Sequence, residues 1–265
     1  MNQSNLFTVA KHIKLQLLSK LKTNEFKTYE DLIQYVESTV KDYGYESAFP
    51  TTIAPDYVVS NWTPLKLDRQ MALHYTICTV DFGIRDKEGL ICDTAITTTN
   101  SVYWNKKLSL YKSILRTIES KINSNYLKNN FIYSADITKI VETEFSGTCF
   151  NIIPECCAHV IKRNLLHAET ILMCGKGCPN VKLVKGDYFT IEPHVTIGPS
   201  KTVLEPGTIF LDLKTNKYDT LDNRLNLESD CKRTILYSSV KSDSRSFYEE
   251  DTYYLGEDLV NCTGV

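Results

Sequence analysis

The chain has 265 residues, 42% of them hydrophobic, with only 8 prolines and 11 glycines, which is the composition of a globular protein rather than a disordered one. Thirty basic residues face 32 acidic ones, so the formal charge of −2 gives no direct signal for nucleic-acid binding. No apolar stretch reaches the roughly 18 residues that a membrane span needs, and the amphipathic start lacks the features of a signal peptide. These observations predict a cytoplasmic protein.

The nine cysteines are an odd number, and without a secretory signal they are expected to be reduced thiols. Cys174 and Cys178 form a CxxxC pair, but no second pair follows at a distance typical of a zinc ribbon. A loop with two free thiols is therefore favoured over a metal knuckle.

The sequence pattern of the N-terminal half predicts two helices, then a β-hairpin that is described below, and then two more helices. Apolar residues repeat at helical spacing between residues 5 and 22, and a second helix begins at Thr28 with a capping-box pattern and is expected to end near Gly44. Residues 48–51 interrupt the regular pattern, and Tyr57–Val59 predicts a short strand. Further helices are expected at 102–125 and 136–144.

The C-terminal half has strand character. Strands are expected within 183–198, strand fragments separated by turns within 202–229, and a closing hairpin at 248–262. This order of elements favours an α+β fold with an antiparallel sheet. No linker interrupts the chain, so residues 1–265 are expected to form a single domain, with the N-terminal helices in 1–44 and the remaining sheet and helices in 45–265.

Residues Thr76–Thr99 predict a β-hairpin with one aspartate in each arm, Asp81 and Asp93, twelve positions apart. A hairpin folds such positions back beside each other. A single carboxylate in a strand is usually solvated, but two that converge on one face repel each other unless a cation lies between them. Paired hard oxygens suit a divalent ion such as Mn or Fe, or Zn when imidazole joins them.

Further ligands would come from His, Asp or Glu in other strands. His159 and His167 lie eight positions apart in an apolar context, and Glu192 ends an apolar strand before Pro193. Glu249 and Glu250 lie in an aromatic strand near the C-terminus. Each has an ordinary alternative as a structural histidine or a solvated glutamate.

Six segments are similar, in the same order, to motifs of one family of metallopeptidases. The first three are Ala48–Thr51 (AFPT), Trp62–Pro64 (WTP) and Ile77–Gly83 (ICTVDFG). The other three are Ala158–Ala168 (AHVIKRNLLHA), Phe189–Val195 (FTIEPHV) and Glu250–Thr252 (EDT). They resemble the AFPT, HYTP, ICKIDFG and GHSIGxYRIHA motifs, the glutamate strand and the EHT motif of the methionine aminopeptidases, and the type II branch most closely.

The resemblance implies the pita-bread fold, a curved antiparallel sheet with helices packed on its outer face. It also implies a site for two divalent ions, Mn, Co, Fe or Zn, with ligands at Asp81, Asp93, His159, Glu192 and Glu250. In such a site the ions lie roughly 3.5–4 Å apart and share one bridging water or hydroxide. Glu192 would act as general base, and His167 would contact the substrate peptide and steady the tetrahedral intermediate.

The chain departs from the family at Asn61, which stands where the family has a catalytic histidine before the aromatic-Thr-Pro sequence. Asparagine donates a hydrogen bond but does not shuttle a proton near neutral pH. The loss would cost about 10²–10⁴-fold if the histidine acts as an acid. If it only positions the substrate, Asn61 would substitute in part.

Two further departures concern register. The hairpin is one residue longer between its aspartates than is usual in the family, and this residue is expected in the turn 85–89, where it flips neither arm. The last ligand is expected at Glu250 rather than Glu249, because only one of two adjacent strand residues faces the site.

Phe49 and His194 are candidate residues for the wall of the substrate cleft. The alternative for Phe49 is packing in the hydrophobic core, and the alternative for His194 is a position in a solvated loop.

The resemblance leads to two main functional hypotheses and one less favoured one. The first is an aminopeptidase that removes the initiator methionine, or a related N-terminal residue, from peptides or nascent proteins. The alternative is a weakened or inactive pita-bread protein that binds peptides or other proteins, and a proline-directed peptidase of the same fold is less favoured. The expected partners are peptide N-termini, with the ribosome as a further candidate, and the protein is expected to be a monomer without the charged N-terminal extension of eukaryotic type II enzymes.

Overall fold

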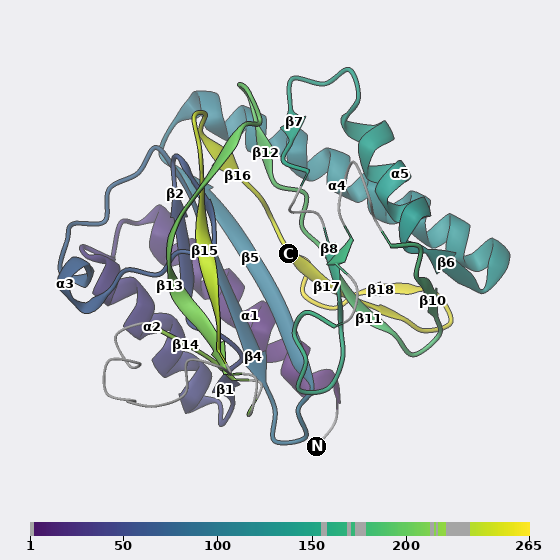
Figure 1. Ribbon diagram of the computed structural model, residues 1–265, viewed down its shortest axis with the longest axis horizontal. Coiled ribbons are helices and arrows are strands. Elements are labelled where there is room, and N and C mark those ends of the chain that lie inside the picture. The colour runs from purple at the N-terminus through teal and green to yellow at the C-terminus, as the bar shows by residue number, and fades with distance from the viewer. Residues whose placement is uncertain are drawn as a thin grey trace.

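The computed structural model describes residues 3–154, 158–168, 171–172, 179–212, 215, 217–220 and 234–265. Helices α1 and α2 lie along one side of a β-sheet layer, while α4 and α5 lie on the other half of the molecule (Figure 1). The helices are α1 (Gln3–Lys22), α2 (Tyr29–Asp42), α3 (Lys66–Arg69), α4 (Val102–Asn129) and α5 (Ser134–Phe145).

The strands of the described residues pair in an antiparallel manner throughout. The early strands are β1 (Glu46–Ser47), β2 (Thr52–Pro55), β3 (Val58–Ser60), β4 (Ile77–Arg85), β5 (Ile91–Thr99), β6 (Phe131–Tyr133), β7 (Asn151–Ile152), β8 (Ala158–Ile161) and β9 (Ile171–Leu172). The later strands are β10 (Lys182–Val184), β11 (Tyr188–Ile191), β12 (Val195–Thr196), β13 (Thr202–Asp212), β14 (Lys217–Thr220), β15 (Thr234–Ser242), β16 (Ser246–Phe247), β17 (Asp251–Leu255) and β18 (Leu259–Asn261).

The two N-terminal helices form where their periodicity predicts them. The apolar stripe of α1 is buried, and α2 begins at Thr28, whose side chain accepts from the amide of Asp31 while the Asp31 carboxylate accepts from the amide of Thr28. This capping box satisfies amide groups that the first helical turn leaves unpaired. The chain turns away after α2 at Gly44, whose φ of +80° favours glycine.

The hairpin β4–β5 is continuous. Its pairing runs from Ile77 opposite Thr99 to Arg85 opposite Ile91 without a register shift, so neither arm holds an extra residue and the turn comprises 86–90. Successive strand residues face opposite sides. Apolar residues on one side of the hairpin pack against α1 and α2: Cys78, Val80, Phe82, Ile84, Cys92 and Ile96. Asp81 and Asp93 therefore face away from these helices.

A second core lies under α4 and α5. Tyr111, Ile118 and Ile122 of α4 pack with Phe189 of β11 and Phe247 of β16. This core supports the sheet with strand order β18-β17-β11-β8-β9. The two halves meet where Ala95 of β5 forms an antiparallel bridge with Glu250, immediately before β17. The backbone amides of Ala95 and Glu250 each donate to the other residue's carbonyl, at 3.1 and 3.3 Å.

Residues 202–212, which were expected to form separate strand fragments, differ from that expectation. Residues Thr202–Asp212 form one strand, β13, which pairs with β15 on both sides of a register shift between Glu205 and Ile209. Pro206 lacks an amide donor and lies within this irregularity, where a strand tolerates proline. The expectation of separate fragments was therefore wrong for 202–212, and residues 221–229 of the same stretch lie outside the described residues.

The described cysteines are free thiols: Cys78, Cys92, Cys149 and Cys262. The pair Cys174 and Cys178, with Cys156, Cys157 and Cys231, lies outside the described residues. Within the part of the chain that the structure describes, no helix has the length and apolar composition needed to cross a membrane.

Candidate metal centre

The hairpin brings Asp81 and Asp93 to one face of its two strands. Asp81 lies opposite Ala95, and Asp93 is two residues from Ala95 along the same strand, so the two aspartates are diagonal neighbours. Asp93 is buried, and Asp81 is partly buried and accepts hydrogen bonds from the hydroxyls of Tyr248 (3.0 Å) and Thr52 (3.4 Å). The arrangement is the one that the hairpin predicts.

His159 faces these carboxylates from β8. Its Nε2 lies 3.2 Å from Asp93 Oδ2, 3.6 Å from Glu192 Oε1 and 3.5 Å from Glu250 Oε1. Its Nδ1 lies 3.0 Å from the carbonyl oxygen of Leu166, an acceptor only, so Nδ1 carries the proton and donates it there. In the neutral ring this leaves the Nε2 lone pair directed at the carboxylates, which is the arrangement of a metal-binding histidine.

Glu192 follows β11 and Glu250 precedes β17, two strands that pair with each other. The Glu250 side chain is 2% exposed, whereas 17% of the Glu192 side chain remains accessible. Glu249 faces the other way, because its Oε1 accepts from the Thr97 amide (2.8 Å) and contacts Lys112 Nζ (3.2 Å). Of the two adjacent glutamates, only Glu250 contacts His159 in the described structure.

The neighbouring groups do not compensate the negative charge that the carboxylates of the cluster would carry when ionised. Burial, followed by the charge of neighbouring carboxylates, raises the pKa of Asp81, Asp93 and Glu192 well above the ordinary values, and raises the pKa of Glu250 to about 7. Three buried oxygens accept no hydrogen bond from the described part of the chain: Asp81 Oδ1, Asp93 Oδ1 and Glu250 Oε1. Buried acceptors of this kind need a partner.

A divalent cation fits this requirement. Ligand atoms of Asp93, His159 and Glu250 lie within 4.8 Å of one another, and carboxylate oxygens with one imidazole nitrogen suit Mn, Fe, Co or Zn. Asp81 and Glu192 flank this triad through Asp93 and His159. The five residues that the sequence nominates as ligands thus come together in one cluster.

His167 lies beside the cluster rather than in it. Its ring packs edge-on against His159 with 4.5 Å between centroids, and its Nδ1 lies 2.9 Å from the Tyr218 hydroxyl. Burial and the nearby His159 lower the pKa of His167 to about 3, so the ring is neutral at physiological pH. Tyr218 comes from β14, a segment that the sequence pattern did not connect with the site.

Asn61 follows β3 and adopts a left-handed backbone with a φ of 59°, which asparagine tolerates better than most residues. Its side chain is partly exposed and makes no hydrogen bond with the described residues. The next residue, Trp62, packs against a small cluster that contains Tyr248. Asn61 therefore precedes a residue that packs beside Tyr248, and its side chain makes no hydrogen bond to the carboxylates of the described residues.

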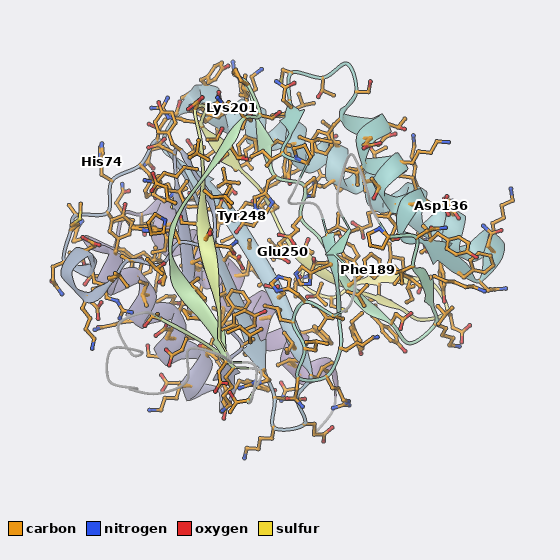
Figure 2. The ribbon with its side chains drawn as sticks, in the orientation of Figure 1. His74, Asp136, Phe189, Lys201, Tyr248 and Glu250 are labelled. Atoms are coloured by element: carbon orange, nitrogen blue, oxygen red, sulfur yellow. The ribbon has the colours of Figure 1, made fainter. Side chains whose placement is uncertain are left out.

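Two residues of the site were missed or misjudged from the sequence. Tyr248, whose hydroxyl donates to Asp81, lies near Glu250 in the middle of the molecule (Figure 2) and stacks on His194 with 3.6 Å between ring centroids. The solvated alternative for His194 was wrong, because this side chain is buried and its Nδ1 lies 2.7 Å from the Glu192 carbonyl oxygen. Phe49 packs in an apolar cluster and contacts the ring of Tyr218.

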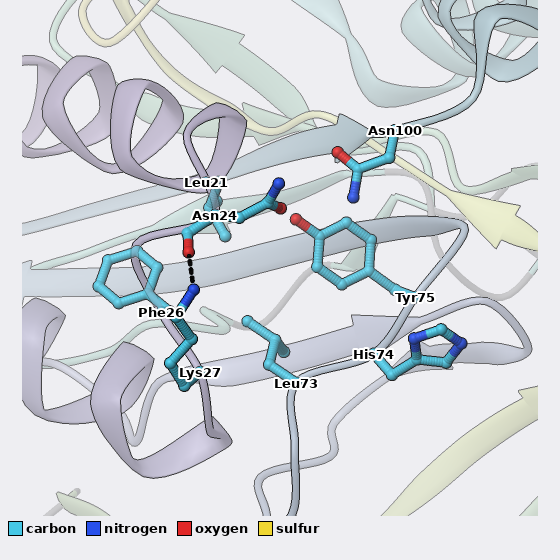
Figure 3. A pocket seen from close by; sticks show the side chains of 8 residues that line it. All are labelled: Leu21, Asn24, Phe26, Lys27, Leu73, His74, Tyr75 and Asn100. Atoms are coloured by element: carbon cyan, nitrogen blue, oxygen red, sulfur yellow. Dashed lines mark hydrogen bonds between the residues drawn. The ribbon is translucent and has the colours of Figure 1, made fainter.

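A separate hollow of about 250 Å³ opens between the end of α1 and the residues before β4 (Figure 3). It is lined by Asn24, Lys27, His74 and Tyr75 among others, and Lys27 Nζ donates to the carbonyl oxygen of Asn24. None of the predicted metal ligands lines it.

Comparison with solved structures identifies the class of fold. The chain matches methionine aminopeptidase from Thermotoga maritima with a TM-score of 0.71 and 19% identity, over 98% of this chain and 95% of that one. It matches a thermophilic Arx1 with a TM-score of 0.73 and 11% identity, over 99% and 91%. The chain has the pita-bread fold, an α+β architecture, as the resemblance implied.

Within this class, the sequence is similar to archaeal, type II-like methionine aminopeptidases. It is 25% identical to the Thermococcus kodakarensis enzyme over 224 residues, which cover 82% of this chain and 71% of the relative. It is 27% identical to the Thermococcus onnurineus enzyme over 214 residues, 78% and 68% of the two chains. No model of a known protein family matches the chain. The resemblance to methionine aminopeptidases is thereby confirmed.

Proposed function

We propose that the protein is a metal-dependent aminopeptidase that removes the initiator methionine, or a related N-terminal residue, from peptides or nascent proteins. The observation that carries this proposal is the set of three buried carboxylate oxygens that accept no hydrogen bond from the described residues, in a cluster of carboxylates that His159 Nε2 faces. The similarity to archaeal methionine aminopeptidases supports the same substrate class.

Asp81, Asp93, His159, Glu192 and Glu250 would hold two divalent ions, of which Mn, Co, Fe and Zn are the candidates. Bound there, the ions would make water a stronger nucleophile and polarise the scissile carbonyl group. Asp81 would be oriented by Tyr248, and His159 by the Leu166 carbonyl oxygen. Such outer contacts fix the direction in which a ligand offers its lone pair.

Glu192 is the candidate general base. Its side chain is 17% exposed, compared with 4% for Asp93 and 2% for Glu250, so an attacking water and a leaving amine can approach it. Its raised pKa suits a group that takes a proton from the water and later gives it to the amine.

His167 would serve as a neutral hydrogen-bond donor. In the tautomer in which Nδ1 accepts from the Tyr218 hydroxyl, the proton of the ring lies on Nε2 and would be donated to the carbonyl oxygen of the substrate. Such a donor stabilises the charge that develops on that oxygen. Asn61 would donate from its amide to the substrate but would transfer no proton.

The alternative is a peptide-binding protein with weak or no catalytic activity. Asn61 favours it, because the family has an ionisable histidine at this position. The alternative would bind peptides or other proteins, and it differs from the aminopeptidase in lacking efficient turnover. Ribosome association, a monomeric state and a cytoplasmic location stay predictions.

The test is release of methionine from a Met-Ala-Ser peptide by protein reconstituted separately with Mn, Co, Fe and Zn. We expect turnover by the wild type, a loss of more than about 10³-fold in Asp93→Ala, and a gain in Asn61→His of up to the 10²–10⁴-fold that a proton-transferring side chain contributes. Histidine tolerates a left-handed backbone nearly as well as asparagine, so the variant is expected to fold.

Metal content measured on the same samples separates the outcomes. If the wild type releases no methionine but Asn61→His does, the site is complete and is inactivated by the residue at position 61 alone. If wild type and Asn61→His are both silent and neither retains metal, the aminopeptidase proposal fails and the peptide-binding alternative replaces it.

A further inference from the structure

Lys14 is a buried lysine behind the carboxylate cluster. It lies in the middle of α1, its side chain is 1% exposed, and its Nζ donates to Asp251 Oδ1 (2.7 Å) and to the backbone carbonyl oxygen of Glu250 (3.0 Å). A buried ammonium group is costly unless it is paired and hydrogen-bonded. Lys14 thus spans 236 positions of the chain to reach the backbone of a candidate metal ligand.

Lys14 belongs to a group of charges that we call the rear network, consisting of Lys14, Lys112, Glu249 and Asp251. Glu249 and Asp251 flank Glu250 in the sequence, and adjacent residues of an extended chain point to opposite sides. Asp251 also accepts from the Thr263 hydroxyl and the Asn261 amide, and Glu249 contacts Lys112 and the Thr97 amide. The rear network is therefore held from several elements while Glu250 faces the cluster.

The charges of this network compensate one another. Lys14 pairs with Asp251, and Lys112 pairs with Glu249, so the hollow of about 320 Å³ beside them presents no unpaired charge of these four residues to a ligand. Lys14 makes one further hydrogen bond outside these two ion pairs, to the carbonyl oxygen of Glu250. Together with the Thr94 hydroxyl and the Ala95 amide, which donate to the same oxygen at 2.8 and 3.1 Å, this bond restrains the backbone of Glu250.

We propose that Lys14 is a positioning residue for the metal centre. By holding the Glu250 backbone it fixes the direction of the Glu250 carboxylate, and it thereby sets the metal affinity and connects helix α1 to the site. This inference rests on the metal centre proposed above. Loss of a partner that orients a metal ligand typically weakens metal binding by about 10–100-fold.

The test compares Lys14→Met with Lys112→Met in the full chain. Both replace a lysine of the rear network, but only Lys14 bonds to the Glu250 backbone. We expect Lys14→Met to bind Mn²⁺ about 10–100-fold more weakly in a calorimetric titration, and Lys112→Met to stay near the wild-type affinity. In the metal-free protein, we expect hydrogen exchange of the Glu250 amide, which bonds to Ala95, to be faster in Lys14→Met only.

A double variant separates positioning from charge balance. Lys14→Met leaves Asp251 without its cation, whereas Lys14→Met with Asp251→Asn removes both charges of the pair. We expect the double variant to recover thermal stability and still to show weak Mn²⁺ binding and fast exchange at Glu250. Recovery of stability, affinity and slow exchange together would overturn the positioning role.

The two measurements also separate this inference from the proposed function. A wild type that binds Mn²⁺, with Lys14→Met matching it in affinity and exchange, would refute the role of Lys14 and leave the metal centre standing. A wild type that binds none of Mn²⁺, Co²⁺, Fe²⁺ and Zn²⁺ would refute the metal centre, and equal exchange at Glu250 in both proteins would then refute the positioning of Glu250 as well.

Discussion

At the residue scale, Tyr248 connects two parts of the candidate site. Its hydroxyl donates to Asp81 Oδ2 at 3.0 Å, and its ring stacks on His194, whose Nδ1 lies beside the carbonyl oxygen of Glu192. Burial and the nearby Asp81 raise the pKa of Tyr248 well above the ordinary value, so the hydroxyl keeps its proton. A retained proton means that the hydroxyl remains a donor to Asp81 over the whole physiological pH range.

Tyr248→Phe removes this donor while keeping the ring that stacks on His194. We expect Mn²⁺ affinity to fall by about 10-fold or more, because Asp81 loses a contact that orients it. Calorimetric titration with Mn²⁺ measures the change. Tyr253→Phe is the matched control, since its hydroxyl is buried but bonds to Asn261 on the rear side. Equal affinities of the two variants would show that the Tyr248 hydroxyl does not orient Asp81.

At the element scale, strand β4 depends on a glycine at its tightest contact. A Cβ added at Gly83 would lie 2.4 Å from Phe49 Cε1 and 2.9 Å from Ala48 Cβ, far closer than packed carbon atoms approach. Phe49 is itself packed against Ile91, Leu166 and Tyr218. Gly83 therefore lets residues 48–49 cross the hairpin at the position that pairs with Asp93.

Gly83→Ala is expected to destabilise the fold by about 1–3 kcal/mol through overpacking. Denaturant titration measures the change, and Phe49→Leu supplies the test of its cause. If the clash is with the Phe49 ring, the two substitutions together cost less than the sum of their separate effects. If the losses in the free energy of unfolding of the two single variants add up in the double variant, the destabilisation by Gly83→Ala comes from the backbone of β4 instead.

At the scale of the whole molecule, the carboxylate cluster makes the metal-free protein less stable as the pH rises. The pKa of Glu250 is raised from 4.5 to about 7, so between these values the folded chain binds a proton that the unfolded chain has released. The stabilisation of the folded state by this proton on Glu250 is fully present below pH 4.5 and is lost as the pH rises through about 7. A bound divalent ion has the opposite dependence, because it binds the deprotonated carboxylates.

Chelator-treated protein is therefore expected to unfold at a lower temperature at pH 8 than at pH 5, and Mn²⁺ to restore more stability at pH 8. Glu250→Gln, which cannot ionise, should reduce both effects. Glu88→Gln removes an exposed carboxylate and should keep the wild-type profile. Scanning calorimetry at both pH values gives the answer, and a Glu250→Gln profile identical to the wild type would exclude Glu250 as their source.

The parts of the site that local patterns determine were predictable. Alternation along β4 and β5 places Asp81 and Asp93 on one face, and the capping box at Thr28 marks the start of α2. Lys14 and Tyr218 were not predictable, because each reaches the site from an element whose sequence pattern is that of an ordinary amphipathic helix or strand. Their contacts depend on how distant elements pack, and a single sequence does not encode such contacts in its local periodicity.

The bridge between Ala95 and Glu250 has a consequence for the order of assembly. It joins residues 155 positions apart, so the entropy of closing a long loop is lost before the carboxylates can meet. During synthesis the hairpin can form as soon as it leaves the ribosome, but Glu250 arrives only after most of the chain. At the proposed metal centre, acquisition of metal would therefore be a late event in the maturation of the protein, and bound metal would report that both halves have docked.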